Sequence, residues 1–235
     1  MFYLAIIPSI VLFSLIWKMD KAEKEPAWLL IKLFFCGMLT IISAMLIGTA
    51  GTNLTKLVLN EESMLFILID NFIMTALIEE GGKYFVLKKV TWKNPAFNYT
   101  FDGVVYAVMA SLGFATLENI LYVFEGGVGV AISRALLSVP GHVIDAIFMG
   151  SYYGAAKLVE ARGDSAGCKR NLKLALIVPT LLHGFYDFSL STPYDAFLYA
   201  FIVFEIVIVI VTIKKVKKLS KNDVAITDDG GNNMV

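Results

Sequence analysis

Cysteines and charged residues are scarce in this chain of 235 residues. Its two cysteines are Cys36, in an apolar run, and Cys168, in a polar loop, so the sequence offers neither a disulfide framework nor a CxxC metal site. It also lacks a GxSxG motif, a Ser-Lys arrangement and an HExxH helix, which disfavours a serine mechanism and the zinc site of soluble zincins. No internal repeat and no separate soluble domain is evident.

Apolar residues dominate what is present. They make up 57% of the chain against 17% charged residues, more than a single soluble core would hide, so we expect the lipid bilayer to be the main solvent. Crossing a bilayer as a helix takes about 20 apolar residues. We therefore predict an all-α, polytopic membrane bundle with a membrane domain over 1–219, a disordered cytoplasmic tail over 220–235, and seven transmembrane helices at 2–17, 28–48, 64–87, 102–124, 135–157, 173–191 and 194–213.

The basic residues are unevenly distributed, although the net charge is zero. Most of the 20 Lys and Arg residues lie in four clusters that follow the first, third, fifth and seventh apolar segments. The loops between these clusters carry only Lys56 and Arg134. Because cytoplasmic loops are enriched in Lys and Arg, the pattern places the amino terminus outside the cell and the carboxyl terminus in the cytoplasm.

Several ionisable side chains fall inside the predicted spans. Each costs roughly 2.5–3.5 kcal/mol at a helix centre on insertion scales, so each is a candidate functional residue. Both histidines of the chain are among them. The set is Asp70, Glu79, Glu80, Lys83, Asp102, Glu118, His142, Asp145, His183, Asp187 and Glu205.

A pair of adjacent glutamates stands out in the third span. Glu79 and Lys83 are four residues apart and share a helix face, where they could form a salt bridge, while Glu80 points about 100° away. A structural explanation is weaker for two adjacent carboxylates followed by Gly81-Gly82, since glycines let a neighbouring backbone approach closely. This segment is therefore a candidate catalytic site.

The two histidines lie in later spans. His183 and Asp187 are four residues apart, so they face one side of a helix, and the carboxylate could orient the imidazole or join it in binding a metal. His142 follows Pro140-Gly141, a kink of the kind that often lines a cavity, and it could equally be structural.

Other polar residues admit structural explanations. Glu118 and Asn119 lie among small residues and could clamp two helices together by hydrogen bonds. Asp102 is expected to cap the start of its helix. Asp145 lies one turn from His142 and could orient it. Two further carboxylates have no obvious partner in the sequence, Asp70 and Glu205.

These residues supply the parts for hydrolysis. A carboxylate can activate water as a general base, and histidines can bind a metal or stabilise an oxyanion. Buried Glu, Asp and His residues would also suit a proton- or ion-coupled transporter, although no inverted repeat supports one. They could also serve only to clamp helices in a non-catalytic membrane scaffold.

Five motifs occur in a set order along nearly the whole chain. They are Glu79-Glu80-Gly81-Gly82-Lys83, Phe101-Asp102-Gly103, Gly113-Phe114-Ala115 leading to Glu118-Asn119, then His142, and His183-Gly184-Phe185-Tyr186-Asp187. In these motifs the sequence resembles the PrsW proteases, relatives of the CAAX prenyl endopeptidase and of bacteriocin-processing membrane proteases. Three positions depart from the wider CAAX pattern: Lys83 replaces an arginine, Ser138 a phenylalanine and Asp187 an asparagine.

The resemblance implies a multi-pass protease of the bacterial cell membrane that responds to envelope stress. Such an enzyme makes the first, extracytoplasmic (site-1) cut in a single-pass transmembrane anti-sigma factor, and a second protease completes release of the sigma factor. The expected partners are this membrane substrate and the lipid bilayer, with no nucleic acid.

The resemblance also implies roles for individual residues. Glu79 would be the water-activating base, and His142 would position the water or bind a metal. His183 with Asp187 would form an oxyanion or metal site. The supporting residues would be Glu80, Lys83, Glu118, Asn119 and Asp102. Glu79, His142 and His183 would either hold a metal such as Zn²⁺ or act directly on water.

The predicted topology adds one requirement. Glu79 and Glu80 fall toward the cytoplasmic half of their helix, whereas an extracytoplasmic cut needs access from the opposite side. A water-filled cavity that reaches inward, or a substrate helix drawn into the core, would meet it.

Overall fold

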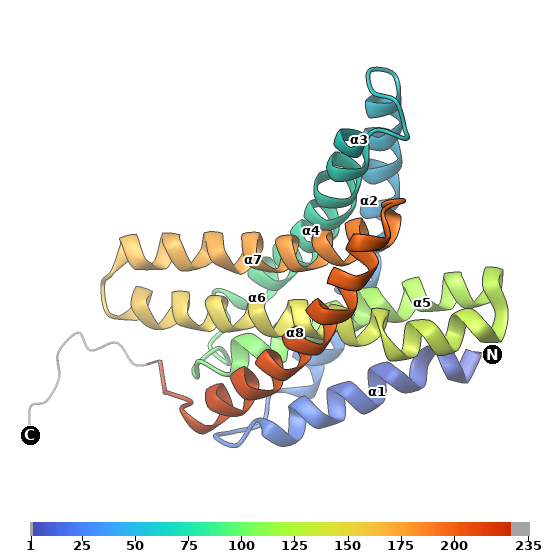
Figure 1. Ribbon diagram of the computed structural model, residues 1–235. Helices are drawn as coiled ribbons and strands as arrows, with labels where there is room; N and C mark the ends of the chain where they lie inside the picture. Colours follow the sequence, from blue (N-terminus) through green and yellow to red (C-terminus); the bar gives the residue numbers. More distant parts are fainter. Residues whose placement is uncertain (1, 227–235) are drawn as a thin grey trace, which may run out of the picture.

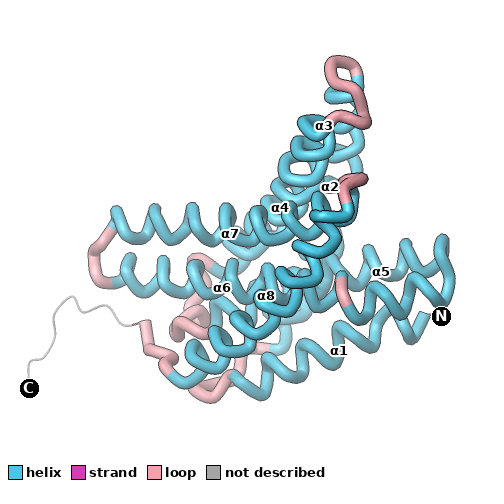
Figure 2. Tube along the Cα trace, viewed as in Figure 1, coloured by secondary structure: helices cyan, strands magenta, loops and turns pink. Residues whose placement is uncertain are grey.

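The computed structural model describes residues 2–226, and helices make up most of them (Figures 1 and 2). The one β contact among these residues is an isolated bridge between Tyr99 and Ala225. The expectation of an all-α fold is confirmed. The helices are α1 (Phe2–Met19), α2 (Ala27–Lys56), α3 (Met64–Ile69), the π-helix η1 (Asp70–Leu77), α4 (Ile78–Thr91), α5 (Asp102–Leu136), α6 (Ser138–Ala161), α7 (Ser165–Ser191) and α8 (Asp195–Lys221).

Four helical stretches are long and apolar enough to cross a membrane. They are Ala27–Lys56, Asp102–Ala161, which joins α5 to α6, Ser165–Ser191 and Asp195–Lys221. The described part of the chain therefore has the helices of a multi-pass membrane protein. The segment expected at 64–87 consists of α3, η1 and α4, which follow one another directly. The count of seven crossings and the orientation of the termini stay predictions.

Local sequence determines where several helices begin. The Ser63 side chain accepts a hydrogen bond from the Phe66 backbone N–H at 3.1 Å at the start of α3. The Asp164 side chain accepts one from the Gly167 N–H at 2.8 Å at the start of α7. Such caps satisfy backbone donors that have no partner within the helix, so these helices start where the sequence offers a capping side chain.

Helix α5 reverses direction at Gly127. This residue has φ 73°, a conformation that glycine adopts without strain. Arg134 in the second arm contacts Glu118 in the first at 2.5 Å, whereas in a straight helix these residues would lie about 24 Å apart. The second arm thus folds back along the first (Figure 1). The loop expected between 124 and 135 is wrong, because helix resumes directly after Gly127.

The first half of α5 is the centre of the molecule. Residues 102–108 are all buried, and α2 crosses α5 with backbone against backbone. A Cβ added to Gly37 would lie 2.0 Å from the Ala110 carbonyl oxygen, and one added to Gly113 would lie 2.0 Å from that of Phe34. Small residues allow this approach, which replaces the hydrophobic effect as the source of helix association in a bilayer.

Helix α8 lies at the edge of the bundle. Only 17% of the residues in its 18-residue apolar segment are buried, against 72% for the corresponding segment of the stretch that joins α5 and α6. Large apolar side chains such as Ile202, Val203 and Ile206 are exposed along it. Because hydrocarbon is the solvent at this depth, an exposed apolar surface of this kind is typical of a lipid-facing helix.

The beginning of the expected tail is ordered. Asp223 accepts hydrogen bonds from the Thr100 hydroxyl at 2.9 Å and the Phe101 N–H at 2.8 Å, and the Ile226 N–H donates to the Asn98 carbonyl at 2.6 Å. Disorder from residue 220 is therefore wrong for 220–226, since these contacts attach the segment to the loop before α5. Residues 227–235 lie outside the described residues. Cys36 and Cys168 are both free, as expected.

The α2–α5 contact gives a stability prediction. A Gly113→Val change places side-chain atoms where the Phe34 backbone already lies, and forcing such a contact typically costs about 1–3 kcal/mol. We expect a lower melting temperature in detergent than for the wild type. Gly129→Val is the matched control, because apart from the adjoining backbone of its own helix no atom lies within 4 Å of a Cβ at that position. Equal melting temperatures for the two variants would contradict the close packing of α2 on α5.

Candidate active site

A π-helix leads into the glutamate pair. Helix η1 is anchored to α2 by a hydrogen bond from the Thr52 hydroxyl to Asp70 at 2.5 Å, and to α7 by one from the Ser191 hydroxyl to Asn71 at 3.1 Å. Single π-turns are rare in proteins and occur often at functional sites. Asp70, which had no obvious partner in the sequence, thus helps to hold the segment that positions Glu79.

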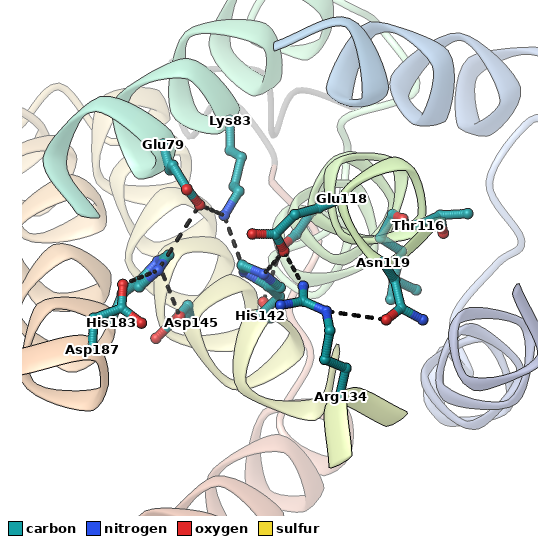
Figure 3. Close-up of polar contacts among 12 residues, drawn as sticks. Glu79, Lys83, Thr116, Glu118, Asn119, Arg134, His142, Asp145, His183 and Asp187 are labelled. Carbon is teal, nitrogen blue, oxygen red and sulfur yellow. Dashed lines mark hydrogen bonds and ion pairs between the residues drawn. The ribbon is translucent and has the colours of Figure 1, made fainter. Parts of the chain in front are cut away.

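The buried ammonium of Lys83 is the centre of the site. Its Nζ donates to Glu80 Oε1 at 2.6 Å and to His142 Nδ1 at 3.2 Å, and it forms an ion pair with Glu79 Oε2 at 3.6 Å (Figure 3). The Glu79–Lys83 salt bridge expected from their spacing is confirmed. Although Glu80 starts on another face of α4, its side chain reaches the same ammonium. Both glutamates therefore share one cation.

His142 connects this cation to α5. A lysine ammonium has only donors, so His142 Nδ1 accepts, and Nε2 carries the proton that it donates to Glu118 Oε2 at 2.9 Å. Arg134 Nη2 donates to the same oxygen at 2.5 Å, and Arg134 Nε donates to Asn119 Oδ1 at 3.1 Å. Glu118 and Asn119 are thus a clamp, as one of the two sequence interpretations held, and the clamp belongs to the site.

His183 lies on the other side of Lys83, on α7. Its Nδ1 is 3.0 Å from Glu80 Oε1 and its Nε2 is 3.2 Å from Asp187 Oδ2. A ring with a carboxylate at each nitrogen is best satisfied when both nitrogens carry a proton, so the geometry favours the positively charged imidazolium. Glu79 Oε2 lies 3.9 Å from the same Nε2.

Asp145 belongs to the site, but not with the partner expected. Its Oδ2 lies 3.9 Å from His183 Nδ1, whereas His142 points to Lys83 and Glu118. The prediction that Asp145 orients His142 is therefore wrong. The spacing of three residues put the two side chains on one face of α6, but the partners on α4 and α5 turn the His142 ring away.

Asp102 lies away from these residues. It is the first residue of α5, about 24 Å along the helix from Glu118. Its carboxylate accepts hydrogen bonds from the backbone N–H groups of Asn98 at 3.0 Å and Tyr99 at 2.7 Å, both before the helix. The expected cap is wrong in detail, because the carboxylate holds the preceding loop and not the first turn. We assign it to the fold.

Arg134 is a site residue that sequence reasoning missed. The predicted topology puts it in an exterior loop. The reversal of α5 at Gly127 brings it back to Glu118 and Asn119 (Figure 3). The signal in the sequence that could have identified Arg134 was that it is one of only two basic residues in the predicted exterior loops. The reversal itself could not be read from the sequence.

A cavity of about 380 Å³ opens onto the cluster. It lies between η1, α4, α5, α6, α7 and α8. Its ionisable lining residues include Glu79, Glu118, Arg134, His142, Asp145, His183, Asp187 and Glu205. A second cavity of about 560 Å³ lies between α2, η1 and α5. Glu79 and Glu118 line both cavities, so they stand where the two meet.

The donor atoms fit a divalent metal ion. Two groups each have ligand atoms within 4.8 Å of one another: Glu80, His142, Asp145 and His183, and separately Glu79, Glu118 and His142. Buried carboxylate oxygens Glu79 Oε2 and Glu80 Oε2 have no hydrogen-bond partner in the described part of the chain. Unpartnered buried oxygens of this kind suit a cation. The set expected from the resemblance, Glu79, His142 and His183, is divided between the two groups.

The fold and the site define a class: a multi-pass helical membrane protein with a buried glutamate–histidine centre that opens into a cavity. Residues 25–213 match the family described as PrsW family intramembrane metalloprotease. The chain belongs to this family, as its motifs indicated, and is a membrane protease.

Curated relatives agree with this assignment, and each is named Protease PrsW. The relative from Oceanobacillus iheyensis is 35% identical over 219 residues, which cover 93% of this chain and 95% of the relative. That from Bacillus subtilis is 37% identical over 190 residues, covering 79% and 80%. That from Clostridioides difficile is 32% identical over 222 residues, covering 93% and 90%. No solved structure matches the chain.

The central lysine gives a second stability prediction. Lys83→Met leaves two buried glutamates without their cation, and breaking a buried pair in this way typically costs about 3–5 kcal/mol. We expect a large drop in melting temperature. Lys157→Met is the control, since it removes a partly exposed pair with Glu160 of the kind worth roughly 0–1 kcal/mol. Similar effects of the two changes would show that Lys83 is not the central ion of the site.

Proposed function

We propose that this protein is an intramembrane endopeptidase in which Glu79 is the general base, and that it makes the first, extracytoplasmic cut in a single-pass anti-sigma factor. Release of the sigma factor in response to envelope stress would follow a second cut by another protease. The observation that carries the proposal is the position of Glu79, a partly exposed carboxylate at the junction of two cavities.

The two adjacent glutamates differ in their availability. Glu80 is only 1% exposed, and one of its oxygens is bound to both Lys83 and His183. Glu79 is 13% exposed and lines both cavities. A general base must reach the proton that it removes. This supports Glu79 as the base and Glu80 as a residue that positions Lys83 and His183.

The other groups complete a hydrolytic sequence. Glu79 takes a proton from water, and the resulting hydroxide adds to the scissile carbonyl carbon. The negative oxygen that forms is stabilised by an N–H of the charged His183 ring, which Asp187 orients. The C–N bond then breaks as protonated Glu79 returns its proton to the leaving amine. His142, held by Lys83 and Glu118, keeps one wall of this site in place.

We further propose that Zn²⁺ is the metal of this member of the family. The group Glu80, His142, Asp145 and His183 suits it best, because three of these residues line the cavity and Glu79 remains outside the group as base. The three that line the cavity, His142, Asp145 and His183, are two histidines and a carboxylate, and with a fourth position open they form a ligand set typical of catalytic zinc. With Zn²⁺ bound, His142 and His183 would be neutral and each would give one ring nitrogen to the metal. The metal would then replace the charged His183 N–H in polarising the scissile carbonyl, and it would favour ionisation of water.

The second cavity supports a cut on the extracytoplasmic side. Its α2 wall runs from Ile41 to Lys56, about 22 Å along the helix, and its α5 wall ends at Glu125. Lys56 and Glu125 are the residues that the sequence places at the exterior surface. Water and an extended substrate segment would therefore reach Glu79 from outside. A cavity in this position would meet the requirement for extracytoplasmic access that the predicted topology sets.

The first test is cleavage by the purified protein in detergent, with a single-pass anti-sigma factor as substrate. We expect Glu79→Gln to lower the rate by about 10²–10⁴, because it removes the base and keeps the shape of the side chain. Glu62→Gln, on an exposed loop, is the control. Unchanged cleavage by Glu79→Gln would overturn the assignment of the base.

Absence of cleavage by the wild type, with solute movement in vesicles, would favour a transporter. A Glu79 change that only destabilises the fold would favour a scaffold.

The second test removes the metal. We expect a strong chelator to abolish cleavage and added Zn²⁺ to restore it. Asp145→Asn should lower the zinc content of the purified protein, measured by mass spectrometry, because it removes a charged oxygen ligand. Asp195→Asn on the exposed start of α8 controls for loss of one negative charge. Full zinc content in Asp145→Asn would exclude the proposed ligand group, and cleavage that resists chelation would mean that Glu79 works without a metal.

A further inference from the structure

Glu205 is the one carboxylate of the cavity wall to which the proposed mechanism gives no role. It lies about 15 Å along α8 from Asp195, in the middle of an otherwise apolar stretch. It lines the active-site cavity together with its neighbours Phe204 and Ile208. Glu205 therefore faces the catalytic groups from the helix at the edge of the bundle.

The Glu205 carboxylate has no partner in the fold. No hydrogen bond or ion pair joins it to another residue within 2–226. Every other carboxylate that lines this cavity has a cationic or imidazole neighbour. A charged group inside a membrane protein is costly and usually marks a functional position. Since Glu205 forms no such contact in the described fold, its carboxylate is available to a group from outside the chain.

The charges around the cavity indicate what that partner is. Five carboxylates line it, and the one permanent cation on its wall is Arg134, which is already bound to Glu118. His183 is shared between Glu80 and Asp187. A metal ion in the proposed ligand group would neutralise its own ligands and leave Glu205 as it is. The cavity therefore has an excess of negative charge on the α8 side.

The surroundings of Glu205 connect the cavity to the lipid. An apolar pocket on the outer face of α7 and α8 shares Phe204 and Ile208 with the active-site cavity. Its other residues include Tyr199 and Val203, both strongly exposed and thus lipid-facing. A transmembrane segment that packs against α8 would bring its side chains to Glu205 at this border.

We propose that Glu205 binds a basic side chain of the substrate, a Lys or Arg within or next to its transmembrane segment, and thereby selects the segment that enters the site. The inference rests on the proposed function. A basic residue in a membrane segment is itself costly to bury, so pairing with Glu205 compensates two unpaired charges at once. Glu205 is thus a specificity residue.

Binding can be tested without cleavage. The Glu79→Gln protein in detergent would be titrated with apolar helical peptides of roughly 20 residues that carry one central Lys, Met or Glu. We expect the Lys peptide to bind about ten-fold more tightly than the Met peptide, a preference that Glu205→Gln removes and Glu205→Lys reverses in favour of the Glu peptide. Asp195→Asn, which removes an exposed carboxylate from the same helix, should keep the preference.

The outcomes separate this inference from the proposed function. An unchanged Lys-to-Met ratio in Glu205→Gln would overturn the role of Glu205, even if the wild type cleaves its substrate through Glu79. Conversely, a preference for the Lys peptide that Glu205→Gln removes would still support the role of Glu205, even if Glu79→Gln cleaved as fast as the wild type. Because Glu205 has no partner in the fold, Glu205→Gln should melt no lower than the wild type. A marked drop in melting temperature would mean that the residue is structural.

Discussion

One buried cation organises the centre of this membrane protein. The Lys83 ammonium holds both glutamates of α4 and the His142 ring of α6. Through His142 it is connected to Glu118 on α5, and through Glu80 to the histidine of α7. In a low-dielectric interior each of these polar groups would be costly without a partner, so the network is stable only when all of its helices are present together. The packing of α4, α5, α6 and α7 therefore depends on it.

The same network makes two neighbouring glutamates unequal. Glu80 is 1% exposed and is held by Lys83 and His183, while Glu79 is 13% exposed and lies where two cavities meet. A shared cation can hold one carboxylate tightly and leave the second more accessible, because its position favours one of them: 2.6 Å to Glu80 against 3.6 Å to Glu79. Of these two adjacent glutamates, Glu80 thus serves to hold the site together, and Glu79 is the one placed to take part in the proposed chemistry.

The candidate site was largely predictable from the sequence, because charge inside an apolar span is rare and costly. Of the predicted site residues, only Asp102 lies elsewhere. Errors arose where a partner is distant in sequence. Asp145 was assigned to His142 by spacing alone, although it lies beside His183. The order of the first tail residues depends on Asp223 and Thr100, 123 positions apart, which no local composition reveals.

The sequence by itself determined that the chain is helical and membrane-bound, because backbone groups in hydrocarbon must be satisfied within each segment and the apolar runs have the length to span it. It also carried the family motifs. Only the tertiary structure decided which side chains share a partner. Lys83 meets His142 across 59 positions, Glu80 meets His183 across 103, and Arg134 reaches Glu118 only because α5 reverses at Gly127. The physical reason is that helical periodicity determines which face of its own helix a residue lies on, whereas tertiary packing decides which neighbouring helix that face contacts.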